Sequence, residues 1–377
     1  MIDIVLSERD FEYELQALVT GFFPGVHNRV LIQPEQEDAA LFELAERESG
    51  DGISLLTGVF LGQYEIRGWV LGKGHLHRNS VSVSGGQDFH KHVDKTTHPY
   101  RTTYKNKLKK LLFELYSSIP EEELPEGIQR SIPVWGTMTG VRPTKIPMNR
   151  LLEGEPLEQV RRSMEEEYCC SGGKAELCLD IAVREAKLLQ KAEYDKGYSL
   201  YIAIPFCPST CLYCSFPSYP LERFQALIPD YLEALKKEIR FCAGLQRGKR
   251  LTSVYIGGGT PTTLSAGQME ELLQCLYESF PVNEAAEITV EAGRPDSITR
   301  EKLMVLRKFD VERISVNPQT MQDKTLQSIG RHHTVEQTKE VFALARECGF
   351  ENINMDLIIG LPGETPEDFE NTLEQIR

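Results

Sequence analysis

From Tyr201 onward, short segments rich in β-branched residues alternate with longer amphipathic stretches of helical periodicity. Strands are expected at 200–204, 253–256, 287–290, 311–316 and 352–359. The helices expected between and after them lie near 222–245, 265–280, 299–308, 334–348 and 366–377. Alternation at this interval predicts a parallel sheet with crossover helices, either an open doubly wound sheet or a barrel. Polar motifs follow several of these strands, which is where functional sites lie in parallel α/β architectures.

The N-terminal half of the chain lacks this regular alternation. We expect a helix from Glu8 to Val19, capped by Ser7 with Asp10 at the capping-box position. The other expected elements are strands near 29–33, 53–60, 64–71 and 80–84, a basic helix over 100–116, and helices near 156–168 and 174–194. The sequence therefore predicts an α+β domain of unknown role over residues 1–150, a helical connector over 151–198, and an α/β domain over 199–377.

Composition excludes several classes of protein. The chain has 42 basic and 56 acidic residues among 377, a net charge of -14, which argues against a nucleic-acid partner. No apolar run approaches the ~18 residues of a membrane span, and the first residues lack the basic and apolar regions of a secretory signal. We therefore expect a cytoplasmic protein whose nine cysteines are reduced thiols or ligands. Six of them fit small buried hydrophobic positions in or beside expected helices: Cys169, Cys170, Cys178, Cys242, Cys275 and Cys348.

The other three cysteines, Cys207, Cys211 and Cys214, follow the first expected strand with C-x3-C-x2-C spacing. Three close thiolates can hold three corners of a cubane iron–sulfur cluster and leave one iron open for chemistry, whereas four-cysteine clusters usually carry electrons. Structural zinc is the alternative interpretation, but zinc needs four ligands, and no second cysteine pair or histidine lies close by. The triplet therefore favours a cluster with an open iron.

A glycine-rich turn, Gly257-Gly-Gly-Thr-Pro-Thr262, directly follows the second expected strand. Its glycines let a ligand approach the backbone closely, and its remaining N–H and C=O groups could hold a small zwitterion. The turn lacks the spacing of a dinucleotide-binding turn and the lysine of a phosphate-binding loop, so both interpretations are disfavoured.

Three features of the N-terminal half allow a functional interpretation but are more typical of structural roles. The pairs His75/His77 and His90/His92 could bind a metal, although no carboxylate or cysteine frame accompanies them in the sequence. The lysines within 105–110 could contact RNA or an acidic partner, but a solvated helix face is the simpler interpretation. The turn at 140–145 carries two cations and could bind a carboxylate or phosphate.

Six motifs occur in a fixed order along residues 200–377. They are Tyr-x-x-Ile-Pro-Phe-Cys-x3-Cys-x-Tyr-Cys from 201, Gly-Gly-Gly-Thr-Pro from 257, Glu291, Arg313-x-Ser-x3-Gln319, Gly330-Arg-x-His333, and Asn354-x-Asp-Leu-Ile-x-Gly-Leu-Pro362. In this order they resemble the radical S-adenosylmethionine (SAM) superfamily, specifically its oxygen-independent coproporphyrinogen III dehydrogenase/oxidase group (HemN/HemZ/HemW-like). The domain that precedes them resembles the longer HemZ-like branch found in Gram-positive bacteria. The resemblance implies a partial (β/α)6 radical SAM barrel.

The resemblance also implies roles for individual residues. Cys207, Cys211 and Cys214 would ligate a [4Fe–4S] cluster, whose fourth iron is chelated by the methionyl amine and carboxylate of SAM. The residues that would contact SAM are Tyr201, Tyr213, Gly258, Gly259, Thr260, Glu291, Gln319, Arg331 and Asp356.

The implied reaction is reductive. One electron, from a donor such as a flavodoxin or ferredoxin, would cleave SAM to methionine and a 5′-deoxyadenosyl radical. The radical would take hydrogen from a propionate of coproporphyrinogen III, and loss of CO2 and one electron would leave a vinyl group. Two such steps give protoporphyrinogen IX.

Three departures leave the function open. Ala203 stands where relatives often have histidine, and Ser215-Phe216 follow Cys214, whereas typical dehydrogenases of the group carry a further cysteine two residues after the third ligand. Haem chaperones of the group also lack that cysteine, so a haem-binding chaperone is the alternative. An electron-transfer protein is disfavoured by the missing fourth ligand. The chain ends inside the fifth expected crossover helix, so we expect the sixth strand and any substrate-closing domain to be absent.

Overall fold

The computed structural model describes residues 1–32, 55–62, 65–83, 100–140 and 142–377. The chain divides into two compact units, Met1–Leu188 and Leu189–Arg377, which are described separately. Within these described ranges, no helix is both long enough and apolar enough to cross a membrane. Helices α5 (Leu157–Glu166) and most of α6 (Gly172–Lys191), which the sequence assigns to a connector over 151–198, fall in the first unit.

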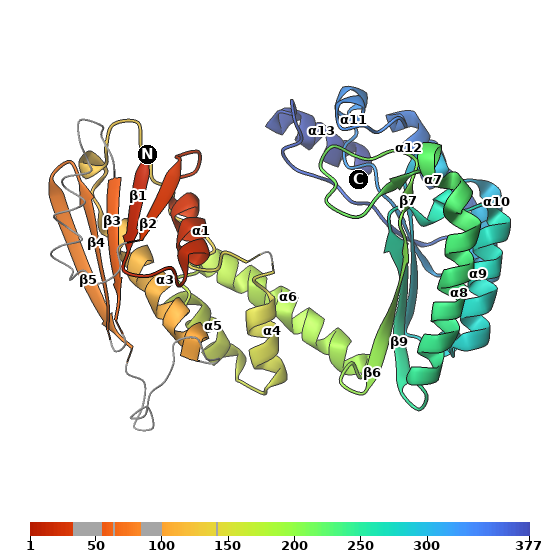
Figure 1. Cartoon of the computed structure of the whole chain (residues 1–377), viewed down its shortest axis with the longest axis horizontal. Coiled ribbons are helices and arrows are strands. Elements are labelled where there is room, and N and C mark those ends of the chain that lie inside the picture. Colours follow the sequence, from red (N-terminus) through yellow and green to blue (C-terminus); the bar gives the residue numbers. More distant parts are fainter. Residues whose placement is uncertain (33–54, 63–64, 84–99, 141) are drawn as a thin grey trace. The chain divides into compact units, whose positions relative to one another are not determined.

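The first unit is built on a five-stranded sheet with the order β2-β1-β3-β4-β5. The strands are β1 (Ile2–Leu6), β2 (Asn28–Ile32), β3 (Leu55–Leu61), β4 (Glu65–Gly72) and β5 (His75–Ser82). Strand β1 is parallel to both β2 and β3, and the β3-β4-β5 part is antiparallel. Helices α1 (Glu12–Phe22) and α3 (Tyr100–Ser118) pack on one face of the sheet and share its buried core (Figure 1). The short helix α4 (Lys145–Leu152), which the sequence did not indicate, precedes α5.

Helix α1 begins later than the sequence predicts. It starts after Phe11, whose backbone is left-handed (φ 66) and which makes no side-chain capping bond among the described residues. Phe11 is buried and stacks on Tyr104, with ring centroids 5.4 Å apart. Ser7 instead accepts a hydrogen bond from the N–H of Leu61 at 2.9 Å. The predicted capping box of Ser7 and Asp10 is therefore wrong, because the packing of Phe11 determines where the helix starts.

Lysines of α3 form hydrogen bonds with other residues of the first unit. Lys109 is buried, donates to Thr139 Oγ1 at 2.8 Å, and has its pKa lowered to about 8, mainly by burial and then by the charge of Lys105. Lys107 donates to the carbonyl of Ser82 at 2.8 Å. These contacts support the structural interpretation of the basic helix.

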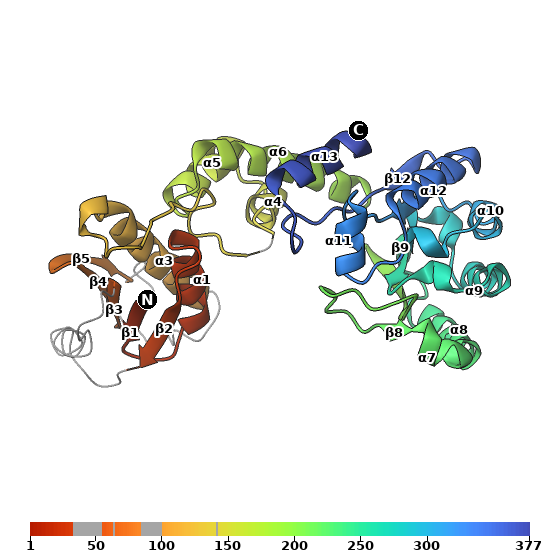
Figure 2. The same ribbon diagram turned by 90° about the horizontal axis from the view of Figure 1, so that it is seen from above.

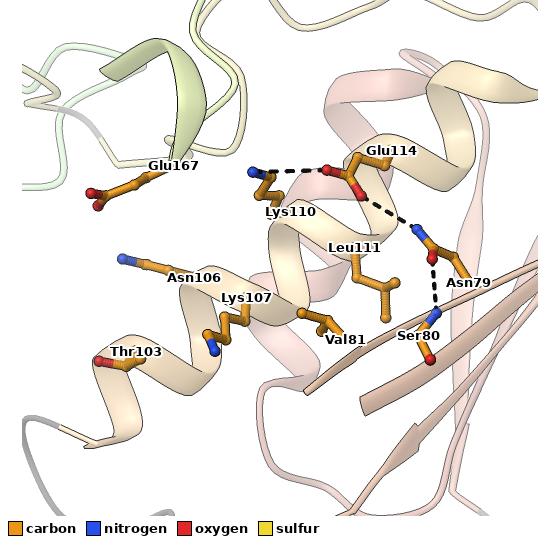
Figure 3. Close-up of a pocket in the computed structure, with 10 residues that line it drawn as sticks. All are labelled: Asn79, Ser80, Val81, Thr103, Asn106, Lys107, Lys110, Leu111, Glu114 and Glu167. Atoms are coloured by element: carbon orange, nitrogen blue, oxygen red, sulfur yellow. Dashed lines mark hydrogen bonds and ion pairs between the residues drawn. The ribbon is translucent and has the colours of Figure 1, made fainter. Parts of the chain in front are cut away.

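A cavity of about 500 Å³ lies between β5 and α3 (Figure 3). Lys110 Nζ lies 3.9 Å from the carboxylate of Glu114 and donates to the carbonyl of Glu166 at 2.7 Å. Glu114 also accepts from Asn79 at 3.3 Å, on the opposite wall. Of the charges that line the cavity, Lys110 and Glu114 are therefore paired with each other.

His75 and His77 project from β5 toward Glu123. The contacts are 2.6 Å from His77 Nε2 to one carboxylate oxygen and 3.7 Å from His75 Nδ1 to the other. The second pair, His90 and His92, lies outside the described residues.

The second unit is a five-stranded, fully parallel sheet with the order β12-β11-β10-β9-β6, so that strands neighbour each other in chain order. The strands are β6 (Gly197–Ile204), β9 (Arg250–Gly258), β10 (Glu287–Gly293), β11 (Arg313–Val316) and β12 (Asn352–Asn354). The crossover helices are α8 (Ile228–Leu245), α9 (Ala266–Ser279), α10 (Arg300–Lys308) and α12 (Val335–Glu347), followed by α13 (Pro366–Ile376). This arrangement confirms the α/β architecture and agrees with a partial (β/α)6 barrel.

The crossover helices form an arc on one side of the sheet (Figure 2). Alternate strand residues, such as Ile256, Val290 and Ile314, point into the core between sheet and helices. Helices α9, α12 and α13 begin at capping boxes whose serine or threonine hydroxyl accepts from the third helical N–H. Shorter elements absent from the sequence prediction are β7 (Phe206–Cys207), β8 (Tyr219–Pro220) and α11 (Asp323–Ser328).

Candidate functional site

A pocket of about 190 Å³ lies at the carboxyl ends of the strands of the second unit. All of the residues predicted to hold a cluster or SAM line it, except Tyr201. Tyr201 stands on β6, is 59% exposed, and stacks on Tyr255 with ring centroids 5.8 Å apart. The sequence did not single out Ser209, Arg294 and Asn317, which also line the pocket. The roles of the predicted residues stay predictions, but their convergence makes them testable together.

The loop that carries the cysteines is fixed by residues far away in the sequence. Leu212 N–H donates to the carbonyl of Ile329 at 3.0 Å, and Ser209 Oγ donates to the carbonyl of Gly330 at 2.8 Å. Arg294, which is 3% exposed, donates to Ser209 Oγ at 2.7 Å and forms a two-pronged ion pair with Asp296 at 3.0 and 2.7 Å. The loop is therefore held in place before any ligand binds.

The three thiols differ in burial, with Cys207 buried and Cys211 and Cys214 half-buried. In the part of the chain that the structure describes, no three His, Cys, Asp or Glu side chains converge on a single metal-ion position. A cubane cluster does not require such convergence, because each cysteine binds a different iron.

The three glycines at the carboxyl end of β9, Gly257 to Gly259, each occupy a position where a larger residue would not fit or would be strained. A Cβ on Gly257 would lie 2.6 Å from both the Glu291 carboxylate and the Tyr255 ring, and one on Gly259 would lie 2.7 Å from the carbonyl oxygen of Phe206. Gly258 has a φ of +103, a backbone that favours glycine.

The N–H groups of this turn already have partners inside the protein. Those of Gly259 and Thr260 donate to the carbonyls of Ile204 and Phe206, both at 2.8 Å, and that of Gly258 donates to the carboxylate of Glu291. These three N–H groups are therefore engaged within the protein and are not free to bind a ligand. This observation argues against the part of the prediction in which N–H groups of the turn help to hold a zwitterion.

Two carboxylates share the pocket. Glu291 accepts from the hydroxyl of Tyr255, and its pKa is raised, chiefly by burial and further by the charge of Asp356, against the opposing effect of its hydrogen bonds. Asp356 accepts from Asn354 Nδ2 at 2.7 Å, and its N–H donates to Asn317 Oδ1 at 3.2 Å. A partly desolvated pair of carboxylates attracts a cation, so the pocket suits an ammonium or sulfonium group.

Gln319 has the left-handed backbone (φ 69) that is uncommon for residues other than glycine, and it is 7% exposed. Its N–H donates to the carbonyl of Asp356, and its carbonyl accepts from Ile358, both at 3.0 Å. Backbone strain of this kind gathers at functional sites, where the surrounding structure maintains it.

Arg331 is buried at the pocket wall. Its Nη1 donates to the carbonyl of Asn317, while its Nε has no partner among the described residues. Burial and the neighbouring Cys211 raise the pKa of Tyr213 to about 12, although the charge of Arg331 acts in the opposite direction. A guanidinium that lines the pocket can bind a carboxylate there.

His333 stands behind Arg331 and is 2% exposed, with neither ring nitrogen hydrogen-bonded within the described ranges. Its pKa is lowered to about 4, first by burial and then by the charge of Arg331, with a smaller effect of Arg294 in the same direction. Asp296 and Asp323 oppose the shift. The folded protein therefore holds a neutral imidazole.

We expect His333 to make stability depend on pH. Its folded pKa lies below its unfolded value, so its contribution is complete above about pH 6.5 and is lost as the pH falls toward about 4. When the pH falls from about 7.5 to 5, the free energy of unfolding of the wild type should decrease by roughly 2 kcal/mol more than that of His333→Gln. Urea unfolding at the two pH values measures the difference. The control is His332→Gln at the exposed neighbour, which should keep the wild-type dependence; an equal pH dependence in His333→Gln would contradict the assignment.

Comparisons with known proteins agree with this geometry. Residues 201–376 match the radical SAM superfamily. The oxygen-independent coproporphyrinogen-III oxidase-like protein HemZ of Bacillus subtilis is 43% identical over 245 residues, which cover 64% of this chain and 49% of HemZ. The haem chaperone HemW of the same organism is 39% identical over 176 residues, which cover 46% of each protein.

The solved structure of coproporphyrinogen III oxidase (HemN) from Escherichia coli shares 34% identity, with a TM-score of 0.44, over 51% of this chain and 44% of that one. The chain thus spans about half the length of the curated relatives that it matches. The match to HemZ covers 245 residues, which is more than the 189 residues of the second unit (189–377), and it therefore reaches into the first unit.

Proposed function

This chain belongs to the radical SAM superfamily, in its HemN/HemZ/HemW-like group, and on that basis we propose that it oxidatively decarboxylates coproporphyrinogen III without oxygen. The propionate side chains would become the vinyl groups of protoporphyrinogen IX, a step of haem biosynthesis. The observation that carries this proposal is the convergence of three thiols, two carboxylates and a buried arginine in one pocket at the strand ends. We further propose a cytoplasmic location and a flavodoxin or ferredoxin as electron donor.

The residues of the pocket fit the cofactors of the superfamily, a [4Fe–4S] cluster and SAM. Cys207, Cys211 and Cys214 are the sulfur ligands available to a cluster. The raised pKa of Glu291 beside Asp356 fits the positive charge of a sulfonium or ammonium group. Bound and reduced, the two cofactors supply the one-electron chemistry that removes a hydrogen atom from a propionate.

The protein's own part is to bind, orient and exclude water. In this proposal the carboxylate of Glu291 and the carbonyls of the turn at 257–259 would accept from an ammonium group, and the guanidinium of Arg331 would bind a carboxylate. Thr260, Gln319 and Arg331 are buried, so the wall positions a ligand through groups with little freedom to move.

A haem chaperone is the second candidate, and Phe216 is the observation that favours it. This residue stands two positions after Cys214, where typical dehydrogenases of the group carry a further cysteine, and it is 68% exposed at the pocket. The similarity to the haem chaperone HemW is also substantial. We favour the enzyme because the longer match to HemZ includes part of the first unit.

An anaerobic assay separates the two functions. This chain, and a version extended to the full length of its HemZ relative, are incubated with SAM, a strong reductant and coproporphyrinogen III, and the porphyrins are identified by mass spectrometry after oxidation. In parallel, haem is titrated into each protein and followed by its Soret absorption. We expect the extended version to give the divinyl product. Stoichiometric haem binding with no vinyl product would favour the chaperone.

A further inference from the structure

Cys207 has a hydrogen-bond donor aimed at its sulfur. Thr260 Oγ1 donates to Cys207 Sγ at 3.7 Å. Thr260 is 2% exposed and Cys207 is 9% exposed, so water reaches neither group freely. This contact joins the end of β7 to the residue that follows the three glycines at the carboxyl end of β9.

Thr260 is held in this orientation from three sides. Its N–H donates to the carbonyl of Phe206 at 2.8 Å, which places it directly beside Cys207. Its carbonyl accepts from both the N–H and the hydroxyl of Thr263, at 2.9 and 2.7 Å. Its methyl group faces Gly293, where a Cβ would lie 3.8 Å away. With the backbone and the methyl group fixed, the hydroxyl faces the sulfur.

We propose that Thr260 is a positioning residue that stabilises the Cys207 thiolate by a hydrogen bond and so raises the reduction potential of the cluster. The inference rests on the proposed function, because it needs a cluster on Cys207. Reduction adds one electron, supplied by the low-potential flavin or iron–sulfur donor, and makes the cluster more negative. A hydroxyl donor therefore stabilises the reduced state more than the oxidised one, and hydrogen bonds to cluster sulfurs are among the features that set such potentials.

The burial of this contact makes it effective. A hydrogen bond in a low-dielectric interior acts more strongly on a neighbouring charge than one in water. Cys211 and Cys214 are half-buried, so water can solvate their sulfurs in part. The hydrogen bond from Thr260 to Cys207 should therefore affect the reduction potential more than a contact to Cys211 or Cys214 that competes with water.

The test uses two pairs of variants. Thr260→Val keeps the shape of the side chain and removes the hydroxyl. Thr260→Ser and Thr260→Ala both lack the methyl group and differ only in the hydroxyl. Each protein is loaded with iron and sulfide anaerobically, its iron content is measured, and its midpoint potential is determined by electron paramagnetic resonance at a series of set potentials without SAM.

We expect Thr260→Val to bind as much iron as the wild type but to have a more negative midpoint potential. At a fixed potential its ratio of reduced to oxidised cluster should fall about two- to tenfold, as the loss of one hydrogen bond implies. Thr260→Ser should resemble the wild type. If Thr260→Val takes up no cluster, the second pair decides: the midpoint potential of Thr260→Ala must then be more negative than that of Thr260→Ser. Equal midpoint potentials in the wild type and Thr260→Val, or in Thr260→Ser and Thr260→Ala where Thr260→Val takes up no cluster, would overturn the inference. A wild type that binds no cluster would overturn the proposed function instead.

Discussion

Replacing any one of Cys207, Cys211 and Cys214 by alanine will abolish the iron–sulfur cluster. The wild type, reconstituted anaerobically, should hold about four irons per chain and show a broad absorption band near ~400 nm. Three cysteines bind three of the four irons, so the loss of one cysteine leaves two irons without a protein ligand. Two cysteines are too few to hold the cluster. Iron analysis and the absorption spectrum measure the effect.

The control for this experiment is Cys242→Ala. Cys242 is also half-buried, but it lies in α8 and not in the pocket. This variant should bind iron like the wild type. A full cluster in any single variant of the triplet, or one zinc per chain in place of iron, would show that the assignment of the ligands is wrong.

Arg294→Met will destabilise the second unit and reduce the cluster content. The side chain of Arg294 is 3% exposed, and its removal leaves Asp296, 22% exposed, without its cation. Breaking a buried ion pair from one side costs about 3 kcal/mol or more, because a charge remains unpaired. The variant also loses the hydrogen bond to Ser209 that fixes the loop between the first two cysteines. Urea unfolding and iron content report the two consequences separately.

Two further variants make this prediction sharper. Arg300→Met breaks an ion pair with Glu347 whose side chains are 55% and 64% exposed, so its effect on the free energy of unfolding should be far smaller than that of Arg294→Met. The double variant Arg294→Met with Asp296→Asn removes the unpaired charge, so stability should recover in part while the cluster content stays low. A cluster content equal to the wild type in Arg294→Met would mean that Ser209 needs no such anchor.

The architecture of the second unit follows from its sequence because its signals are local. Each strand is a short run of β-branched residues that becomes buried in the sheet, and each crossover helix has its own apolar face and, in several cases, its own capping box. Since parallel strands bring their carboxyl ends to one edge, residues as distant as Cys207 and Asp356 could be expected at one site.

What the sequence did not indicate depends on tertiary contacts. Ser209 and Arg294 meet only because the cysteine loop folds against the end of β10, and no local pattern specifies that contact. Arg294 directly follows a strand, which is the one signal that could have suggested it. The left-handed backbone of Gln319 similarly results from its pairing with the segment around Asp356.

The first unit was harder to predict because its local signals conflict with its packing. The start of α1 is set by the burial of Phe11 and not by the residues that resemble a cap. Strand β1 was missed although its residues are all buried, because a five-residue strand at the N-terminus has few flanking turn signals.

The central claim is that three cysteines hold a cubane whose fourth iron is open to SAM. Mössbauer spectroscopy of the protein reconstituted with ⁵⁷Fe tests this directly, because it resolves individual iron sites of one cluster. We predict that adding SAM will shift the signal of about one iron in four and leave the others unchanged, as expected for three thiolate-bound irons and one open iron. A spectrum in which all irons are equivalent and unaffected by SAM would contradict the account.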